Sequence, residues 1–267
     1  MEKPARLYKY EAFSPQALEN LKNQVIYFNS PLQFNDPYDC ALSPSIKDLS
    51  DEDVEKIRSH YLSRPDISDR PRFEFETMTV PALRAMLLKT GQDVLEKQVR
   101  QFVSQRGVSC FSEVPDNLLM WSHYASHHRG FCLEFRTDAE PFQRIRPVTY
   151  SKTMPEYDLA KMLYDRDFDH IESLYCTKGW DWSYEREWRC IHKEGGTAFT
   201  YAAEALTGVY FGSQASFTTI EIVALILAGQ NEHVQLWQGA RSKSAFSVEF
   251  RQMSYTSHLE AKRQGRL

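Results

Sequence analysis

The chain has 267 residues, of which 42% are hydrophobic and 25% are charged, and its formal net charge is -4. This composition is typical of a globular protein, because it lacks the low hydrophobicity and the blocks of like charge that keep a chain disordered. A slightly acidic chain also lacks the broad basic surface of most nucleic-acid-binding proteins, although a local basic groove is compatible with it.

Cysteine usage and hydropathy predict the compartment. The five cysteines are odd in number and contain no CxxC pair, which is typical of reduced thiols. The N-terminus lacks the apolar segment of a leader, and the longest apolar run, Ile222–Ala228, is too short to span a bilayer. We therefore expect a soluble, cytoplasmic protein that has no membrane partner.

The first 44 residues are predicted to form a strand, a helix, a second strand and a loop. The strands are expected at Arg6–Tyr10 and Val25–Phe28. Between them, Ser14 is a good N-cap and Pro15 suits the first helical position. Prolines in Asn29–Pro44 predict a structured loop, because proline biases the preceding residue away from helix.

Residues 45–106 have a helical pattern, which we interpret as a helical insertion within a single α+β domain of residues 1–267. Ser50 is expected to cap its first helix. A later helix is predicted to end at Gly91 and the next to end at Gly107, because glycine commonly follows the end of a helix.

The remaining strands and helices alternate without a fixed order. Strands are predicted at Val108–Phe111, Phe131–Phe135, Arg144–Tyr150, Trp182–His192, Val209–Gly212 and Ala245–Arg251, and helices at Glu156–Cys176 and Thr219–Ala228. Such an uneven order predicts an α+β fold with a mixed, mainly antiparallel sheet at its core.

The stretch Val108–Phe135, VSCFSEVPDNLLMWSHYASHHRGFCLEF, brackets a helix rich in Trp, Tyr and His between two strands. Aromatic rings can stack on planar or cationic ligands, and imidazoles titrate near neutral pH. His123 and His127 are four residues apart, as in helical zinc sites. Since no HExxH glutamate or further ligand accompanies them, we expect no metal here.

The segment GWDWSYEREWRCIH contains the strongest candidates for catalysis. If it is a strand, Glu185, Glu187 and Arg189 share one face. Two carboxylates in one pocket repel, which raises the pKa of one of them, and Arg189 would restrain the other. Two alternatives stay open: a solvent-facing charged stripe, or a helix that points the two glutamates to different faces. The Trp and Tyr content favours a strand.

The loop sequence FNDPYDC contains Asn35, Asp36 and Asp39. Such residues commonly bond their own backbone and shape the turn. The alternatives are a polar ligand clamp or, together with Glu185 and Glu187, a Mg²⁺ site for phosphodiester chemistry, because hard cations prefer carboxylate oxygens.

Four segments of the chain resemble the bacterial family called domain of unknown function 2971. They are LYKY at Leu7–Tyr10, IYFNSPLQFNDPYDC at Ile26–Cys40, SCFSE...LLMWSHYA...GFCLEF at Ser109–Phe135, and WSYEREWR at Trp182–Arg189. The resemblance covers nearly the whole chain. It implies a compact recurring fold and no particular activity.

A second resemblance is to the ADP-ribosyltransferase superfamily, in which a basic residue, a serine and a glutamate on three successive strands line an NAD cleft. The resemblance implies NAD as the cofactor, Glu187 as the residue that binds a ribose hydroxyl and stabilises an oxocarbenium-like transition state, and Glu185 as its assistant. The residues implied to bind the cofactor are Arg6 or Lys9 with Tyr8 or Tyr10 at the first position, Ser109 or Ser112 at the second, and Trp121, His123 and Tyr124 as the aromatic wall. The chain lacks the Ser-Thr-Ser motif of that superfamily.

Three functions follow from these patterns. The first is an ADP-ribosyltransferase-like enzyme that acts on a protein or nucleic-acid target. The second is a noncatalytic module that binds a small ligand or a peptide. The third is a metal-dependent phosphodiesterase. The sequence specifies neither the target nor the oligomeric state.

Overall fold

The structure is a computed structural model that describes residues 2–41, 45–165 and 175–265. The chain forms two compact units, each made of separate segments. The first unit comprises Met1–Ser30, Gly107–Val148 and Asp181–Leu267, and the second comprises Pro31–Arg106 and Thr149–Trp180. The helical segment expected at residues 45–106 lies in the second unit. That both units form a single domain stays a prediction.

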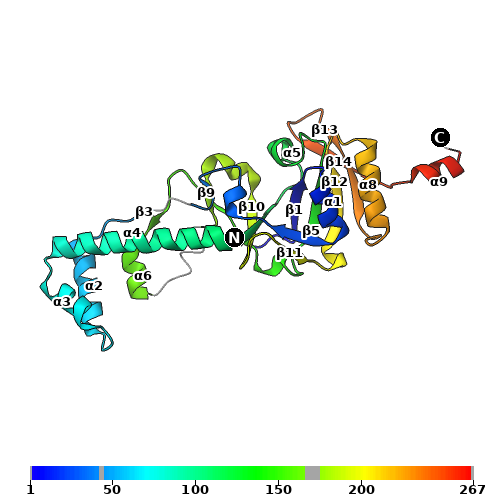
Figure 1. The fold of residues 1–267 in the computed structure, drawn as a ribbon. Coiled ribbons are helices and arrows are strands. Elements are labelled where there is room, and N and C mark those ends of the chain that lie inside the picture. Colours follow the sequence, from blue (N-terminus) through cyan, green and yellow to red (C-terminus); the bar gives the residue numbers. More distant parts are fainter. Residues whose placement is uncertain (1, 42–44, 166–174, 266–267) are drawn as a thin grey trace. The chain divides into compact units, whose positions relative to one another are not determined.

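The first unit is built on an eight-stranded sheet with the order β14-β13-β12-β5-β1-β4-β10-β6 (Figure 1). Its strands are β1 (Arg6–Glu11), β4 (Gly107–Ser112), β5 (Phe131–Arg136), β6 (Arg146–Pro147), β10 (Glu187–His192), β12 (Leu206–Phe211), β13 (Gln235–Arg241) and β14 (Val248–Met253). Adjacent strands run antiparallel except β12 and β13, which are parallel. The predicted α+β class with a mainly antiparallel sheet is therefore confirmed.

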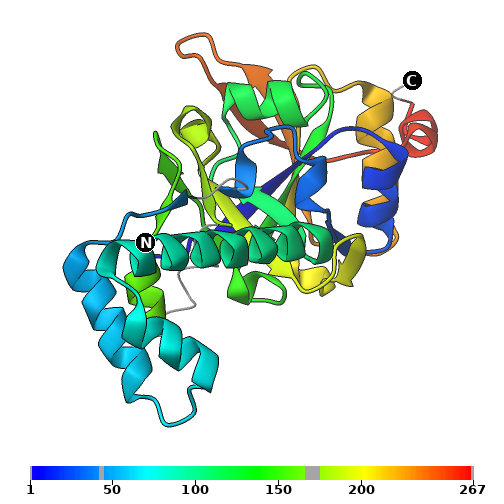
Figure 2. The same cartoon turned by 60° about the vertical axis from the view of Figure 1, so that its left-hand side comes forward.

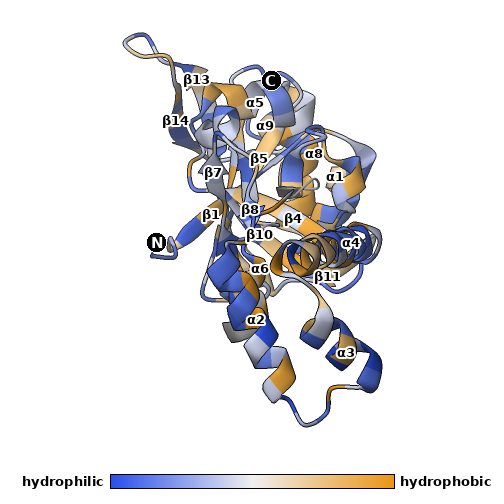
Figure 3. Cartoon of the chain, turned by 90° about the vertical axis from the view of Figure 1, so that its left-hand side faces the viewer, coloured by the Kyte–Doolittle hydropathy of each residue, from blue (hydrophilic) through white to orange (hydrophobic). Residues whose placement is uncertain are grey.

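One face of this sheet carries the main apolar core. Leu7, Phe111, Phe135 and Trp188 pack there against α1 (Pro15–Lys22) and α8 (Phe217–Ala228). These two helices lie side by side in Figure 1, and α8 is apolar along most of its length (Figure 3). The strand β2 (Val25–Phe28), which pairs with β11 (Thr197–Thr200), supplies Ile26 and Phe28 to the same core.

The opposite face of the sheet packs against α5 (Leu118–Tyr124). Trp121 from α5 is fully buried against Tyr10 and Cys132 of the sheet. Asn117 caps α5 by accepting hydrogen bonds from the backbone of the first turn. Because side chains alternate along a strand, the face that carries α5 holds a different set of residues from the apolar core.

The second unit is mainly helical, with α2 (Asp51–Ser63), α3 (Asp69–Thr77), α4 (Val80–Gln105) and α6 (Leu159–Asp165). Two short strand pairs complete it: β3 (Ser45–Ile46) with β8 (Glu156–Tyr157), and β7 (Thr149–Ser151) with β9 (Thr177–Gly179). Figure 2 shows α2 and α3 beside the first turns of α4. Ser50 caps α2 through a capping box, as predicted.

The predicted helix end at Gly91 is wrong, because Gly91 lies inside α4, a continuous helix of 26 residues. A Cβ atom at Gly91 would lie 2.7 Å from Ile46 Cδ1 and 3.0 Å from Leu159 Cδ2. This glycine therefore serves close packing between elements and does not end the helix. The short helix α3 was missed.

The predicted strand Trp182–His192 is wrong in its first half. Residues Trp180–Glu185 form a 3₁₀ helix, here called η4, and the strand begins only at Glu187. Arg186 joins them with a φ of 47°, a left-handed conformation that interrupts the alternation of a strand.

Two further predicted elements also differ from the structure. The predicted strand Arg144–Tyr150 is divided between β6 and β7, which pair with different strands. The predicted helix Glu156–Cys176 is observed over Leu159–Asp165, and residues 166–174 lie outside the described part of the chain. Among the described residues, no helix combines the length and the apolar character needed to cross a membrane.

Candidate functional site

Three adjacent strands bring Tyr8, Ser112 and Glu187 into one row. Tyr8 on β1 pairs with Ser112 on β4, and Ser112 pairs with Glu187 on β10. On the other side of β1, Tyr8 pairs with Glu134 on β5. Directly paired residues point to the same face of a sheet. These four residues, which we call the polar row, therefore share the face that carries α5.

Glu134 is a buried carboxylate of the polar row with four side-chain neighbours within hydrogen-bond distance. It is 2% exposed and accepts hydrogen bonds from Tyr210 Oη at 2.7 Å, Thr207 Oγ1 at 2.7 Å and Tyr8 Oη at 3.1 Å. Arg6 Nη1 lies 2.6 Å from its Oε1 atom. Burial, together with the Glu134 charge, raises the pKa of both Tyr8 and Tyr210. The network thus holds both phenols protonated around one carboxylate.

Sequence reasoning missed Glu134, although a signal was present. In the strand sequence FCLEFR, Phe131, Leu133 and Phe135 alternate as core residues, and Glu134 faces the other side. A carboxylate in a strand that is otherwise apolar has to find buried partners. That requirement marks Glu134 as a candidate even without a motif.

Glu187 is held by an ion pair with Arg189. The Nε and Nη2 atoms of Arg189 lie 2.8 and 3.0 Å from the two carboxylate oxygens, and the side chains are 0% and 4% exposed. Arg189 therefore restrains Glu187, as the sequence suggested. Glu187 and Glu134 are three strand spacings apart, about 14 Å between backbones, so they do not form a carboxylate pair.

Glu185 lies in η4, next to the polar row, and is also buried. Its Oε1 atom accepts a hydrogen bond from Tyr124 Oη at 2.6 Å, and its backbone oxygen accepts one from Ser112 Oγ at 2.6 Å. Asn117 Nδ2 donates to the backbone oxygen of Tyr184 at 3.1 Å. These bonds join η4 to α5 and β4. The burial of both Glu185 and Glu187 rules out a solvent-facing charged stripe.

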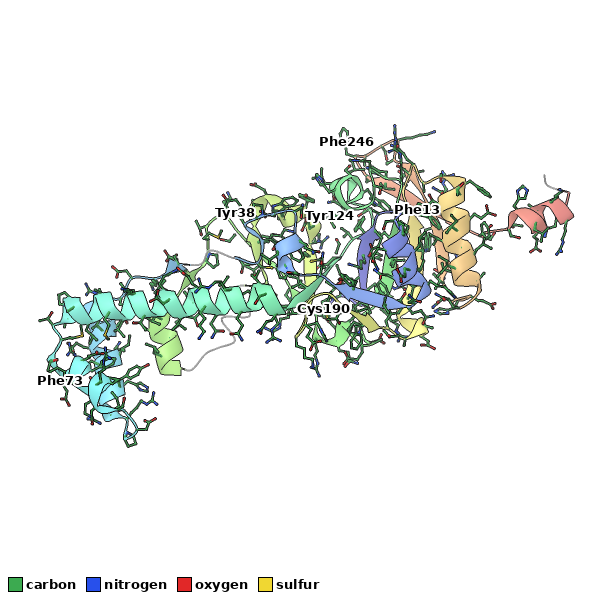
Figure 4. The ribbon with its side chains drawn as sticks, viewed as in Figure 1. Phe13, Tyr38, Phe73, Tyr124, Cys190 and Phe246 are labelled. Carbon is green, nitrogen blue, oxygen red and sulfur yellow. The ribbon has the colours of Figure 1, made fainter. Side chains whose placement is uncertain are left out.

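Beside Tyr124 lies a group of rings that we call the aromatic platform, made of His123, Trp182 and Tyr184. Their ring centroids are 6.1 to 6.5 Å apart. His123 is exposed, and the other two are half-buried. Figure 4 labels Tyr124, which projects from α5. A partly exposed group of rings can stack on a planar ligand.

Two predicted cofactor-binding residues belong to the core instead of the surface. Trp121 is fully buried, and its Nε1 atom donates to the backbone oxygen of Pro115 at 2.7 Å. Tyr10 packs against it with ring centroids 5.2 Å apart and donates its hydroxyl to the backbone oxygen of Val114 at 2.7 Å. Both rings hold α5 on the sheet.

Lys9 and Ser109 point to the opposite face from the polar row, because Lys9 is one residue from Tyr8 and Ser109 is three residues from Ser112, and side chains alternate along a strand. Lys9 Nζ lies 5.3 Å from the centroid of the Phe111 ring, which belongs to the apolar core. Ser109 is buried, and its hydroxyl has no hydrogen-bond partner within the part of the chain that the structure describes. Of the predicted alternatives, the structure brings Tyr8 and Ser112 together with Glu187.

The loop candidates Asn35 and Asp36 belong to the second unit. Asp36 accepts a hydrogen bond from its own loop at Tyr38 N, 2.9 Å away, which is the turn-shaping role expected of it. Asp39 lies 3.2 Å from Lys178 Nζ in a buried ion pair. In the described ranges of the chain, no group of three or more His, Cys, Asp or Glu side chains is placed to hold a metal ion.

The fold and this site define an α+β protein with a buried polar row on one face of a mainly antiparallel sheet. Residues 120–190 match the family model described as "Protein of unknown function (DUF2971)". This local match supports the family resemblance predicted from the sequence, and the matched segment includes Glu134, Glu185, Glu187 and Arg189. No curated protein and no solved structure matches the chain.

Proposed function

We propose that the protein is an ADP-ribosyltransferase-like enzyme that uses NAD to modify a protein or a nucleic acid. The observation that supports this proposal is the cross-strand register of Tyr8, Ser112 and Glu187. Each of these residues occupies one of the three strand positions on which the resemblance rests, and all three share one face of the sheet.

The residue types at the polar row suit this chemistry. When bound, NAD supplies an electrophilic ribose carbon and nicotinamide as the leaving group. The Glu187 carboxylate offers a hydrogen-bond acceptor for a ribose hydroxyl and a negative charge opposite the positive charge that develops during bond cleavage. Arg189 fixes the orientation of this carboxylate through two hydrogen bonds. The half-exposed Arg6 can attract a phosphate, and the aromatic platform can stack on a planar ring.

Access to the row requires movement of the segments that cover it, because Ser112 is 0% exposed and Glu187 is 4% exposed. The contacts that have to open are the hydrogen bonds of Tyr124 with Glu185 and of Asn117 with Tyr184. NAD⁺ is therefore expected to change amide hydrogen exchange in α5 and η4, and to leave exchange in α8 unaltered.

The direct test is transfer of labelled ADP-ribose from NAD⁺ to proteins and nucleic acids of a cell extract by the purified full chain. Glu187→Gln is expected to abolish transfer. The matched control Glu249→Gln, on the exposed part of β14, is expected to keep it. Glu187→Gln removes the negative charge of the carboxylate that pairs with the buried Arg189 guanidinium, so the melting curve of this variant has to be recorded alongside.

A second measurement keeps the proposal testable if Glu187→Gln is unstable. Millimolar NAD⁺ is expected to raise the melting temperature of the unmodified chain by mass action. Tyr8→Phe, a mild change at a half-buried position, is expected to weaken this shift. The proposal is overturned if NAD⁺ does not stabilise the unmodified chain and the unmodified chain transfers no label.

The aromatic platform favours a second candidate, a noncatalytic module that binds a planar small ligand. In that case Glu185 and Glu187 hold the platform in place. NAD⁺ binding without transfer, together with lost binding in Trp182→Ala, is the expected result for this alternative.

A further inference from the structure

A cavity of about 340 Å³ lies in the first unit, lined by the first residue of α5, the turn that follows α5, the loop after β12 and the β13–β14 hairpin. Its principal lining residues are Leu118, His128, Gln214, Arg241, Ser242 and Phe246. The volume lies within the range of small-molecule sites. None of the lining residues belongs to the polar row, so the cavity is a separate feature of the molecule.

The cavity is positively charged. Arg241 has neither an ion pair nor a hydrogen bond to its side chain within the described part of the chain, and no Asp or Glu lines the cavity there. Hydroxyl donors come from Ser213, Ser242 and Ser247. A surface arginine usually forms hydrogen bonds with a carboxylate or with water. A cavity lined by a guanidinium and hydroxyl groups, and by no carboxylate of the described residues, therefore suits an anionic ligand.

His128 adds a second polar side chain to the cavity, and one of its two ring nitrogens is available for a further hydrogen bond. Its Nδ1 atom is buried and has no hydrogen-bond partner among the described residues, and its Nε2 atom lies 3.3 Å from Ser122 Oγ. Burial and the charge of Arg241 lower the pKa of the imidazole, which is therefore neutral and can donate one hydrogen bond. A buried ring nitrogen without a partner is uncommon in proteins.

The backbone that presents His128 is conformationally unusual. Ser126, His127 and His128 are three consecutive residues in the left-handed region, with φ values of 47°, 53° and 67°, and none is glycine. The turn is held by hydrogen bonds of His128 N to the backbone oxygen of Trp121 and of Gln214 N to that of His128, at 3.1 and 2.9 Å. Such conformations concentrate where side chains have to be aimed at a ligand.

The other side of the cavity is apolar. Leu118, Ala245 and Val248 contribute to it, and Phe246 lies in the loop that joins β13 and β14 (Figure 4). Phe246 is 99% exposed. Because this ring is so exposed, it is available to cover the apolar part of a ligand at the mouth of the cavity.

We propose that this cavity binds a small organic phosphate monoester, with its phosphate at Arg241 and the serine hydroxyls and its apolar part against Leu118 and Phe246. Phosphate fits better than carboxylate because its three terminal oxygens match several separate donors. The site does not depend on the activity proposed for the polar row.

The test uses the full chain and phenyl phosphate as the probe, with affinity measured by isothermal titration calorimetry. Arg241→Gln is expected to weaken binding at least tenfold. Arg251→Gln, an exposed arginine on β14 outside the cavity, is expected to leave it unchanged. His128→Asn is expected to weaken binding as well, and asparagine tolerates the left-handed backbone of that position.

Separate arms of the experiment distinguish the two halves of the ligand. Phe246→Ala removes an exposed ring and is expected to weaken phenyl phosphate binding severalfold while leaving inorganic phosphate binding unchanged. Benzoate is expected to bind more weakly than phenyl phosphate. Three results would overturn the proposal. The first is no binding of phenyl phosphate at a probe concentration of about 10 mM, and the second is equal affinity for benzoate and phenyl phosphate. The third is an Arg241→Gln variant that binds phenyl phosphate as tightly as the unmodified chain.

Discussion

Replacing Glu134 by alanine tests how much the hydrogen bonds around this carboxylate contribute to the free energy of unfolding. The change leaves the buried Tyr210 hydroxyl without its acceptor, which costs about 1–3 kcal/mol. It also removes a buried methylene, worth about 0.8 kcal/mol. The Arg6 side chain is 56% exposed and can be solvated by water, so loss of its ion pair with Glu134 adds little to the cost. We expect the free energy of unfolding to fall by about 2–4 kcal/mol.

Urea unfolding followed by tryptophan fluorescence measures this change. The midpoint is expected to fall while the slope of the transition stays constant, because the folded and unfolded states keep their compactness. Glu134→Gln keeps one acceptor oxygen and is expected to cost less, and Glu249→Gln, exposed on the same sheet, is expected to lie within about 0.5 kcal/mol of the unmodified chain. If Glu134→Ala is as harmless as Glu249→Gln, the network does not stabilise the fold.

Three further predictions follow from single contacts. Burial and the 2.8 Å hydrogen bond to Glu221 raise the pKa of Tyr255 to about 12, above its ordinary value of 10.0, so this contribution to stability is complete below pH 10 and is lost as the pH rises to 12. NMR titration of labelled tyrosine is expected to give a lower pKa in Glu221→Gln, and an unchanged value would contradict the assignment. Gly212→Ala would bring a Cβ to 2.2 Å from a backbone oxygen and is expected to cost about 1–3 kcal/mol in thermal unfolding, whereas Gly229→Ala meets nothing closer than 3.8 Å and should cost less. Cys110 is half-buried while the other four cysteines are buried, so peptide mapping is expected to find iodoacetamide first on Cys110.

Local rules were sufficient for many elements of the fold. Ser14, Pro15 and Ser50 carry helix-start chemistry that acts within one turn, and α1 and α2 begin where those residues predict. The strands expected at Arg6–Tyr10, Val108–Phe111 and Phe131–Phe135 are observed as β1, β4 and β5, with ends that differ by one residue. Gly91 misled the prediction because its small size serves a contact with residues distant in sequence, and no local pattern distinguishes that role from a helix end.

The candidate site was only partly predictable. The sequence by itself determined that Glu185, Glu187 and Arg189 lie close together, since short spacing guarantees proximity. It left open whether Tyr8 or Lys9, and Ser112 or Ser109, face them, because a shift of one residue moves a strand side chain to the other face.

Only the tertiary structure decided these questions. The register among β1, β4, β5 and β10 selected Tyr8 and Ser112 and added Glu134 to the same face. The left-handed backbone at Arg186 turned Glu185 out of the strand and toward Tyr124. Register and turn geometry depend on the packing of strands that are distant in sequence, and for that physical reason they lie beyond any local pattern.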